Sequence, residues 1–153
     1  MDKILKTLEE LNENICIGEQ HSKEEIERIR KENYGQEAIF DFHNVPMNDY
    51  SIGYLKLFAK NLAKEIGMRC GPAYYWGTKG ELNSEPELPV KADGISVVQF
   101  IYESSITIHA LDTIQKLYIN IFSCKQFDFD KAKKFILEHI KADLVCEHNI
   151  IRH

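Results

Sequence analysis

This sequence has no long apolar run, no closely spaced cysteine pair and no N-terminal segment of the kind expected for a signal peptide. No apolar run approaches the roughly 20 residues that a bilayer-spanning helix needs, so we expect no membrane partner. The four cysteines, Cys16, Cys70, Cys124 and Cys146, show no CxxC spacing, and the first ten residues are too charged for the core of a signal peptide. These absences predict a cytoplasmic protein with reduced thiols.

An excess of positive charge is also absent. The chain has 19 Lys and Arg residues against 24 Asp and Glu, which gives a net charge of -5. Nucleic acids and anionic membranes are bound by clustered Lys and Arg, so neither is an expected partner. The sequence has no GxSxG elbow, P-loop or GxGxxG, and its histidines have no HxH or HxxxH spacing with carboxylates. We therefore predict no metal and expect a small molecule or another protein as partner.

What is present suffices for one folded domain. A chain of 153 residues with 44% hydrophobic content buries a sizeable core without a second domain. Residues 1–35 are predicted to form an N-terminal helical extension, with a helix over 2–13 and another over 22–32 that opens on Ser22. Residues 36–153 are predicted to form the domain itself.

Within that domain, hydrophobic periodicity predicts β-α-β, then a block of strands, then α-β. The predicted elements are a strand at 37–43, a helix at 51–67, strands at 69–76, 95–102, 105–110 and 117–123, a helix from Asp128 to Ile140, and a strand at 144–150. The loop at 77–94 is long enough to be functional. This order favours an α+β fold, an antiparallel sheet with both helices on one face. Dimerisation would cover the other face and complete an αββα sandwich.

Period-two alternation sorts the side chains of two central strands onto opposite faces. The aliphatic set should pack under the helices, and the polar set should face solvent or a second copy. The polar set comprises Ser105, Thr107 and His109 on one strand, and Tyr118, Asn120, Phe122 and Cys124 on the next. Singly, each of these residues has an ordinary structural explanation, because a strand histidine or cysteine is usually part of the packing.

Their joint spacing is more specific. Residues 94–129 resemble the central segment of the prokaryotic S-adenosylmethionine decarboxylases, and the matching positions fall into register without a gap. They are Ser96, the Glu103-Ser104 dipeptide, Thr107-Ile108-His109 and the strand at 119–124. The resemblance covers roughly residues 36–150 and implies the same fold.

The resemblance also implies a mechanism of pyruvoyl-dependent decarboxylation in polyamine and spermidine biosynthesis. Ser104 would attack the Glu103 carbonyl, with His109 and Ser96 handling proton transfer, and the chain would be cut between residues 103 and 104. Ser104 would become the pyruvoyl cofactor, which forms a Schiff base with the substrate amine. Cys124 would protonate the substrate. Members of the family are dimeric or larger, with shared active sites, so a homodimer is implied here.

Three departures from the family pattern concern the substrate. Where the family has a ribose-binding glutamate four residues past its histidine, this chain has Asp112 one place early. The adenine-stacking aromatic expected before Ser96 is missing, and Tyr74, Tyr75 or Trp76 would replace it only if the long loop folds back. Ser105 stands where prokaryotic relatives have histidine. The implied substrate-binding residues are Asp112, Tyr102 and Asn120.

Three hypotheses follow for the activity. The first is S-adenosylmethionine decarboxylation. The second is a pyruvoyl-dependent decarboxylase of a basic amino acid such as ornithine or arginine, whose cationic side chain would bind a carboxylate of Asp112, Asp93 or Glu87. The third is a homologue that does not process itself and acts as a binding or regulatory protein.

Overall fold

The computed structural model describes residues 21–77 and 93–153. Its elements, in chain order, are α2 (Lys23–Ile29), β1 (Gly35–His43), the 3-10 helix η1 (Met47–Asp49), α3 (Ile52–Glu65), β2 (Cys70–Gly77), β3 (Gly94–Ile101), β4 (Ser104–Leu111), β5 (Lys116–Ser123), α4 (Phe129–His139) and β6 (Asp143–Arg152). The helix predicted over 2–13, most of the predicted loop and the candidate Glu87 lie outside the described residues. None of the described helices is long and apolar enough to cross a membrane.

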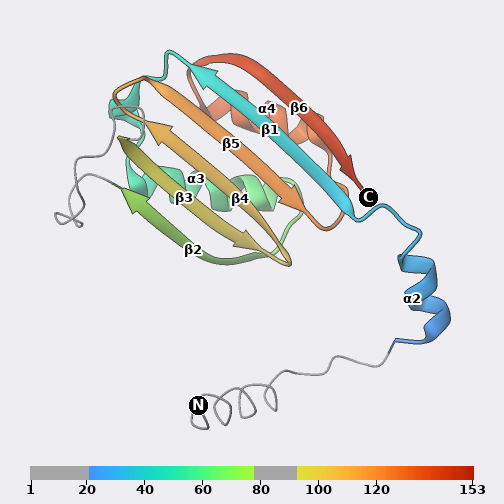
Figure 1. Ribbon diagram of the computed structural model, residues 1–153. Coiled ribbons are helices and arrows are strands. Elements are labelled where there is room, and N and C mark those ends of the chain that lie inside the picture. The colour runs from blue at the N-terminus through green and yellow to red at the C-terminus, as the bar shows by residue number, and fades with distance from the viewer. Residues whose placement is uncertain (1–20, 78–92) are drawn as a thin grey trace, which may run out of the picture. The chain divides into compact units, whose positions relative to one another are not determined.

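The strands form one six-stranded sheet in the order β2-β3-β4-β5-β1-β6, and all neighbours in it are antiparallel. Helices α3 and α4 lie on the same face of this sheet, behind it in the view of Figure 1. The predicted α+β architecture, with both helices on one face, is therefore confirmed. Neither α3 nor α4 covers the opposite face, which we call the open face.

Local capping explains where the helices begin. The Asp128 side chain accepts a hydrogen bond from the Lys131 backbone N–H at 3.0 Å, which confirms the predicted start of α4. Ser51 caps α3 in the same way. Ser22 caps α2 as predicted, but that helix has only seven residues and buries none of them. Helix α2 lies outside the compact unit formed by residues 33–153.

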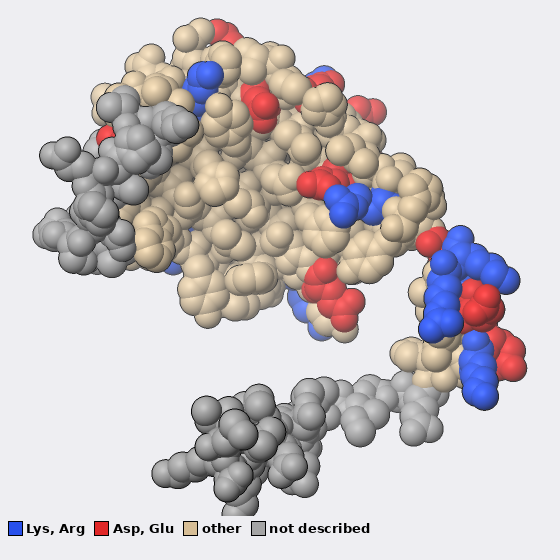
Figure 2. Space-filling view, in the orientation of Figure 1, with Lys and Arg blue, Asp and Glu red and all other residues tan. Residues whose placement is uncertain are grey.

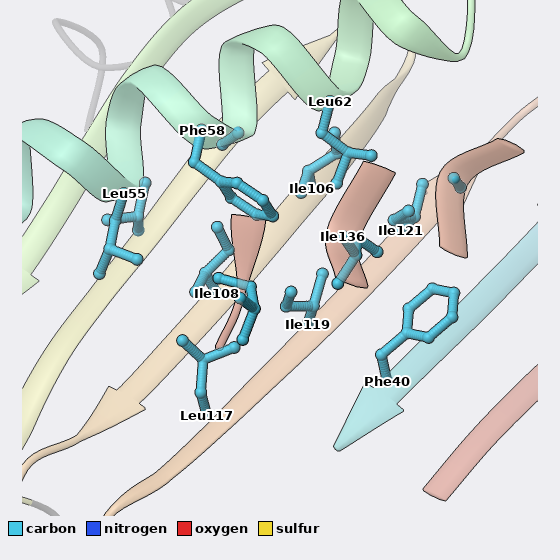
Figure 3. Packing of buried hydrophobic residues seen from close by; sticks show 14 of the residues in the cluster. Phe40, Leu55, Phe58, Leu62, Ile106, Ile108, Leu117, Ile119, Ile121 and Ile136 are labelled. Carbon is cyan, nitrogen blue, oxygen red and sulfur yellow. The ribbon is translucent and has the colours of Figure 1, made fainter. Parts of the chain in front are cut away.

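The core lies between the two helices and the sheet. Figure 3 shows Leu55, Phe58 and Leu62 of α3 over aliphatic side chains of β4 and β5, and Ile136 of α4 beside them. Ile106, Ile108, Leu117, Ile119 and Ile121 supply the strand side of this layer and are at most 1% exposed. Burial of each such side chain contributes about 1.5–3 kcal/mol to folding.

A close approach of β1 to β5 requires glycine at position 35. A Cβ atom built on Gly35 would lie 2.0 Å from the Ser123 carbonyl oxygen and 2.7 Å from the Cys124 carbonyl carbon. Only a residue without a side chain lets the two backbones pair at this point. Gly35 therefore helps to fix the position of the Cys124 backbone.

The two helices are joined at one end by Tyr54. Its hydroxyl donates a hydrogen bond to the His139 carbonyl oxygen at 2.9 Å. Burial raises the pKa of Tyr54 above its ordinary value of 10.0, and the neighbouring Tyr50 and Asp49 raise the pKa further. The neutral phenol is thus the form that suits the α3–α4 contact.

Candidate active site

The Glu103-Ser104 peptide lies at the tip of the β3–β4 hairpin. Ile101 and Ser104 are cross-strand partners, which leaves Tyr102 and Glu103 as a two-residue turn. The sequence placed Tyr102 at the end of a strand and began the next strand at Ser105. The structure instead puts Tyr102 in the turn and extends β4 to Ser104, so the expected cleavage site follows the last turn residue directly.

Ser104 and Cys124 lie together at this end of the sheet. The Cys124 backbone N–H donates a hydrogen bond to Ser104 Oγ at 2.8 Å. The Cys124 Sγ lies 3.8 Å from the Tyr102 carbonyl oxygen, a weak sulfur contact one residue away from the turn's last residue. Both side chains are half-buried. The hydroxyl and the thiol named from the sequence are therefore neighbours in one chain.

Ser96 and His109 form a second pair. They are cross-strand partners on β3 and β4, and Ser96 Oγ is hydrogen-bonded to His109 Nδ1 at 2.8 Å. The His109 side chain is exposed on the open face. A hydroxyl bonded to a solvent-accessible imidazole is an arrangement that can move a proton.

The two pairs are well separated within the chain. Ser104 and His109 are five residues apart on β4, which at the strand rise corresponds to about 17 Å. His109 of this chain therefore lies too far away to exchange a proton with Ser104. The five-residue spacing of Ser104 and His109 on a predicted strand was the sequence signal for this separation.

The candidate substrate-binding residues also lie at different places along the sheet. Tyr102 is 67% exposed beside the Glu103-Ser104 peptide, with the Arg69 guanidinium 5.6 Å from its ring centroid. Asn120 lies on β5, where its Nδ2 donates to Glu37 Oε1 at 2.8 Å. Asp112 follows the far end of β4, beyond His109 rather than near Ser104, and its N–H donates to the Asp93 carbonyl at 3.0 Å.

A charged cluster on the open face was not predicted from the sequence. Glu37 of β1 accepts the hydrogen bond from Asn120 with one oxygen and forms an ion pair with Arg152 of β6 through the other. The Arg152 guanidinium also lies 5.4 Å from the ring centroid of Phe122, the cross-strand partner of both Glu37 and Ser105. The alternation of β1 could have placed Glu37 on this face, but only the strand order brings it beside β5.

Two aromatic residues of β2 reach the open face. Tyr74 pairs with Val98, and Trp76 pairs with Ser96, so β2 places both rings beside β3. They are 63% and 56% exposed. Tyr75 alternates to the other side, where Lys56 of α3 lies over its ring. Tyr74 and Trp76 are thus held by the pairing of β2 with β3, and their part in substrate binding stays a prediction.

The open face as a whole is less polar than β4 and β5 alone indicated. Figure 2 looks onto this face, and its described surface is mostly uncharged. Phe100 and Ile150 add exposed apolar area to that of Tyr74 and Trp76. Within residues 21–77 and 93–153, no three His, Cys, Asp or Glu side chains gather closely enough to hold a metal ion.

Comparison with known proteins identifies the family. The family model for S-adenosylmethionine decarboxylase matches residues 37–153. The crystal structure of the adenosylmethionine decarboxylase from Aquifex aeolicus VF5 superposes with a TM-score of 0.61 at 13% identity, covering 79% of this chain and 92% of that one. No curated protein matches the sequence. The family match spans most of the chain and the fold agrees with it: the protein belongs to the S-adenosylmethionine decarboxylase family, whose members are pyruvoyl-dependent carboxy-lyases.

Proposed function

We propose that this protein is a self-processing S-adenosylmethionine decarboxylase, which supplies the aminopropyl donor for spermidine synthesis. The observation that carries this proposal is the position of Ser104. Its hydroxyl is the first side chain after the Glu103 carbonyl, at a hairpin tip, and it is held by the Cys124 backbone N–H with the Cys124 thiol close by.

These residues fit the making of a pyruvoyl group. Ser104 Oγ attacks the Glu103 carbonyl carbon, the C–N bond breaks, and the hydroxyl proton goes to the freed nitrogen, which leaves an ester. Loss of the Ser104 α-proton then breaks the Cβ–Oγ bond and releases the main-chain carboxylate of Glu103, which becomes the C-terminus of the first fragment. Addition of water and loss of ammonia leave a ketone at position 104. The products are residues 1–103 and residues 104–153.

In turnover, the pyruvoyl group would supply an electrophilic ketone that captures the substrate amine and takes up the electrons released with CO2. The chain's own contribution is to return a proton. The Cys124 thiol lies against the Tyr102 carbonyl, at the edge of the site around position 104. This thiol is the proposed proton donor to the substrate α-carbon.

The separation of the two pairs supports a composite active site in a homodimer. A second copy packed antiparallel on the open face would bring Ser96 and His109 of the partner subunit to the end of the sheet where Ser104 and Cys124 lie. Exposed Tyr74, Trp76, Phe100 and Ile150 give this face an apolar character that suits burial. The dimer would also cover the second face of the sheet and form the αββα sandwich.

The aromatic residues of β2 support S-adenosylmethionine as the substrate. Tyr74 and Trp76 lie in the sheet beside Val98 and Ser96, where an exposed ring can stack on adenine. Asp112 lies at the His109 end of β4 and would enter the composite site with it. A basic amino acid is the alternative substrate, because Thr113 occupies the place of the ribose-binding glutamate.

Intact-mass spectrometry of the purified protein tests self-processing. We expect two fragments cut between residues 103 and 104, with the second one lighter by one ammonia than the corresponding serine peptide. Ser104→Ala should give one uncut chain, whereas the neighbouring open-face variant Ser105→Ala should be cut. An uncut wild-type chain after long incubation would refute the proposal and leave a binding or regulatory homologue.

Release of CO2 from labelled substrates identifies the amine. We expect release from S-adenosylmethionine and none from ornithine, arginine or lysine. Release from ornithine or arginine alone would replace the proposed substrate while leaving the self-processing chemistry intact. Trp76→Ala and Tyr74→Ala should raise the KM for S-adenosylmethionine of the processed enzyme.

A further inference from the structure

The turn that carries the proposed cleavage site has a strained backbone. Glu103 adopts φ 52°, in the left-handed region. This region is disfavoured for residues with a Cβ atom, and two-residue hairpin turns usually place Gly, Asn or Asp there. The turn Tyr102-Glu103 has none of these residues. A residue that disfavours positive φ therefore adopts it directly before the peptide bond of the proposed cleavage.

The surrounding contacts prevent this turn from relaxing. Ile101 is 3% exposed and pairs with Ser104, so the strands close immediately on both sides of the turn. The Tyr102 N–H donates to the Arg69 carbonyl at 3.0 Å on one flank. The Cys124 N–H holds Ser104 Oγ at 2.8 Å on the other. The turn is thus clamped between the segment entering β2 and the end of β5.

The first step of self-processing lengthens this clamped loop. In the peptide, one atom, the Ser104 nitrogen, links the Glu103 carbonyl carbon to the Ser104 Cα. In the ester, two atoms link them, Oγ and Cβ. The bond formed is Oγ–C, the bond broken is C–N, and the proton moves from Oγ to nitrogen. The extra atom gives Glu103 room to leave the left-handed region.

We propose that the left-handed backbone of Glu103 is a positioning feature that favours the acyl shift, because the strain of the turn is released as the ester forms. The inference rests on the proposed self-processing and adds a role for the residue before the serine. Glu103 acts here through its backbone, and its carboxylate is not required. Left-handed strain of this kind corresponds to about a five- to thirty-fold change in an equilibrium or a rate.

Positive φ alone does not make a reactive turn, and the chain contains its own control. Gln115, in the turn between β4 and β5, has φ 51° and lies next to no proposed cleavage site. Replacement of Gln115 by glycine relieves similar strain elsewhere in the protein. Comparing glycine variants of the two turns therefore distinguishes a general effect of relieved strain from an effect on cleavage.

The test combines cleavage time courses with unfolding measurements. In the full-length chain, Glu103→Gln should be cut at nearly the wild-type rate, because the backbone preference is kept. Glu103→Asn and Glu103→Gly should be cut about five- to thirty-fold more slowly. In an uncut Ser104→Ala background, the same Asn and Gly replacements should raise the melting temperature. The gain for glycine is reduced by the greater freedom that it gives the unfolded chain.

Gln115→Gly should raise the melting temperature and leave the cleavage rate unchanged. The proposal is overturned if Glu103→Asn and Glu103→Gly are cut as quickly as Glu103→Gln, or if neither raises the melting temperature of the uncut background. Equal slowing by Glu103→Gln would also overturn it, since the carboxylate would then be the active group. A wild-type chain that is never cut would instead refute the proposed function.

Discussion

Alternate residues of the same strands form the two faces of the sheet, and the two faces differ in burial and in chemical character. On the helix-covered face, Ile106 and Ile108 of β4 are fully buried under α3 and α4. On the open face of the same strand, Thr107 and His109 remain accessible. On this strand, the core isoleucines and the Ser96–His109 pair therefore lie on opposite faces, one residue step apart. Substitutions on one face should leave the property of the other face almost unchanged.

The largest expected effect is the restoration of cleavage when two uncut variants are mixed in one dimer. Ser104→Ala and His109→Ala should each leave the chain uncut when expressed alone. If the open face forms a composite site, a mixed dimer contains one site with both Ser104 and the partner's His109. The His109→Ala chain should then be cut in the co-expressed mixture, as seen by intact mass.

The mixture distinguishes the shared site from a site within one chain. The absence of any cut chain in verified mixed dimers would contradict the composite site. Cutting of His109→Ala alone would show that this imidazole takes no part in processing.

Loss of the Cys124 thiol should separate cleavage from turnover. Cys124→Ala keeps the backbone N–H that holds Ser104 Oγ, so self-processing should continue. Decarboxylation should fall by about 10²–10⁴-fold, the usual contribution of a positioned proton donor. CO2 release per pyruvoyl group measures this effect. Cys146→Ala, which removes another free thiol from the open face, is the matched control and should be near wild type.

Isoleucine truncation compares the two faces directly. Ile119→Ala, at 1% exposure in the core, should cost about 2–5 kcal/mol of unfolding free energy in urea. Ile39→Ala, on the open face of β1, should cost about 1 kcal/mol or less in the monomer because its side chain is only half-buried. Analytical ultracentrifugation should show that Ile39→Ala weakens self-association. Equal unfolding costs would mean that the open face supports the monomer fold.

The smallest expected effect is the alkaline stability of the α3–α4 contact. Because the folded-state pKa of Tyr54 is raised, its stabilising contribution is complete below about pH 10 and is lost as the pH rises through the folded-state pKa. Tyr54→Phe loses the hydrogen bond to His139, at a cost of about 1 kcal/mol near neutral pH. Its stability should then fall less steeply above pH 10. Melting temperatures across pH, with exposed Tyr74→Phe as control, measure this difference.

Local patterns in the sequence were sufficient for most of the fold. The period of β4 and β5 identified their buried faces, and Asp128 gave the start of α4, because alternation and capping depend only on neighbouring residues. The turn at Tyr102-Glu103 was not predicted, since neither residue favours the left-handed region that Glu103 occupies. Its conformation is imposed by strand pairing.

The residues of the candidate site could be predicted from the sequence, but their positions relative to one another could be predicted only in part. Ser104, Cys124, Ser96 and His109 were all named from their spacing. Their division into two pairs depends on the length of β4, and the positions of Tyr74 and Trp76 depend on the β2–β3 register. Glu37 was missed because its contacts come from β5 and β6, far away in the sequence.

The strand order has a consequence for the cut protein. A cut after Glu103 would place β1, β2, β3 and α3 in one polypeptide and β4, β5, β6 and α4 in the other. Because β1 lies between β5 and β6, the two polypeptides interleave and share three lines of strand pairing. Neither polypeptide can dissociate unless all three of these strand pairings are broken. The processed enzyme should therefore migrate as one particle in native solution and separate into two chains only in denaturant.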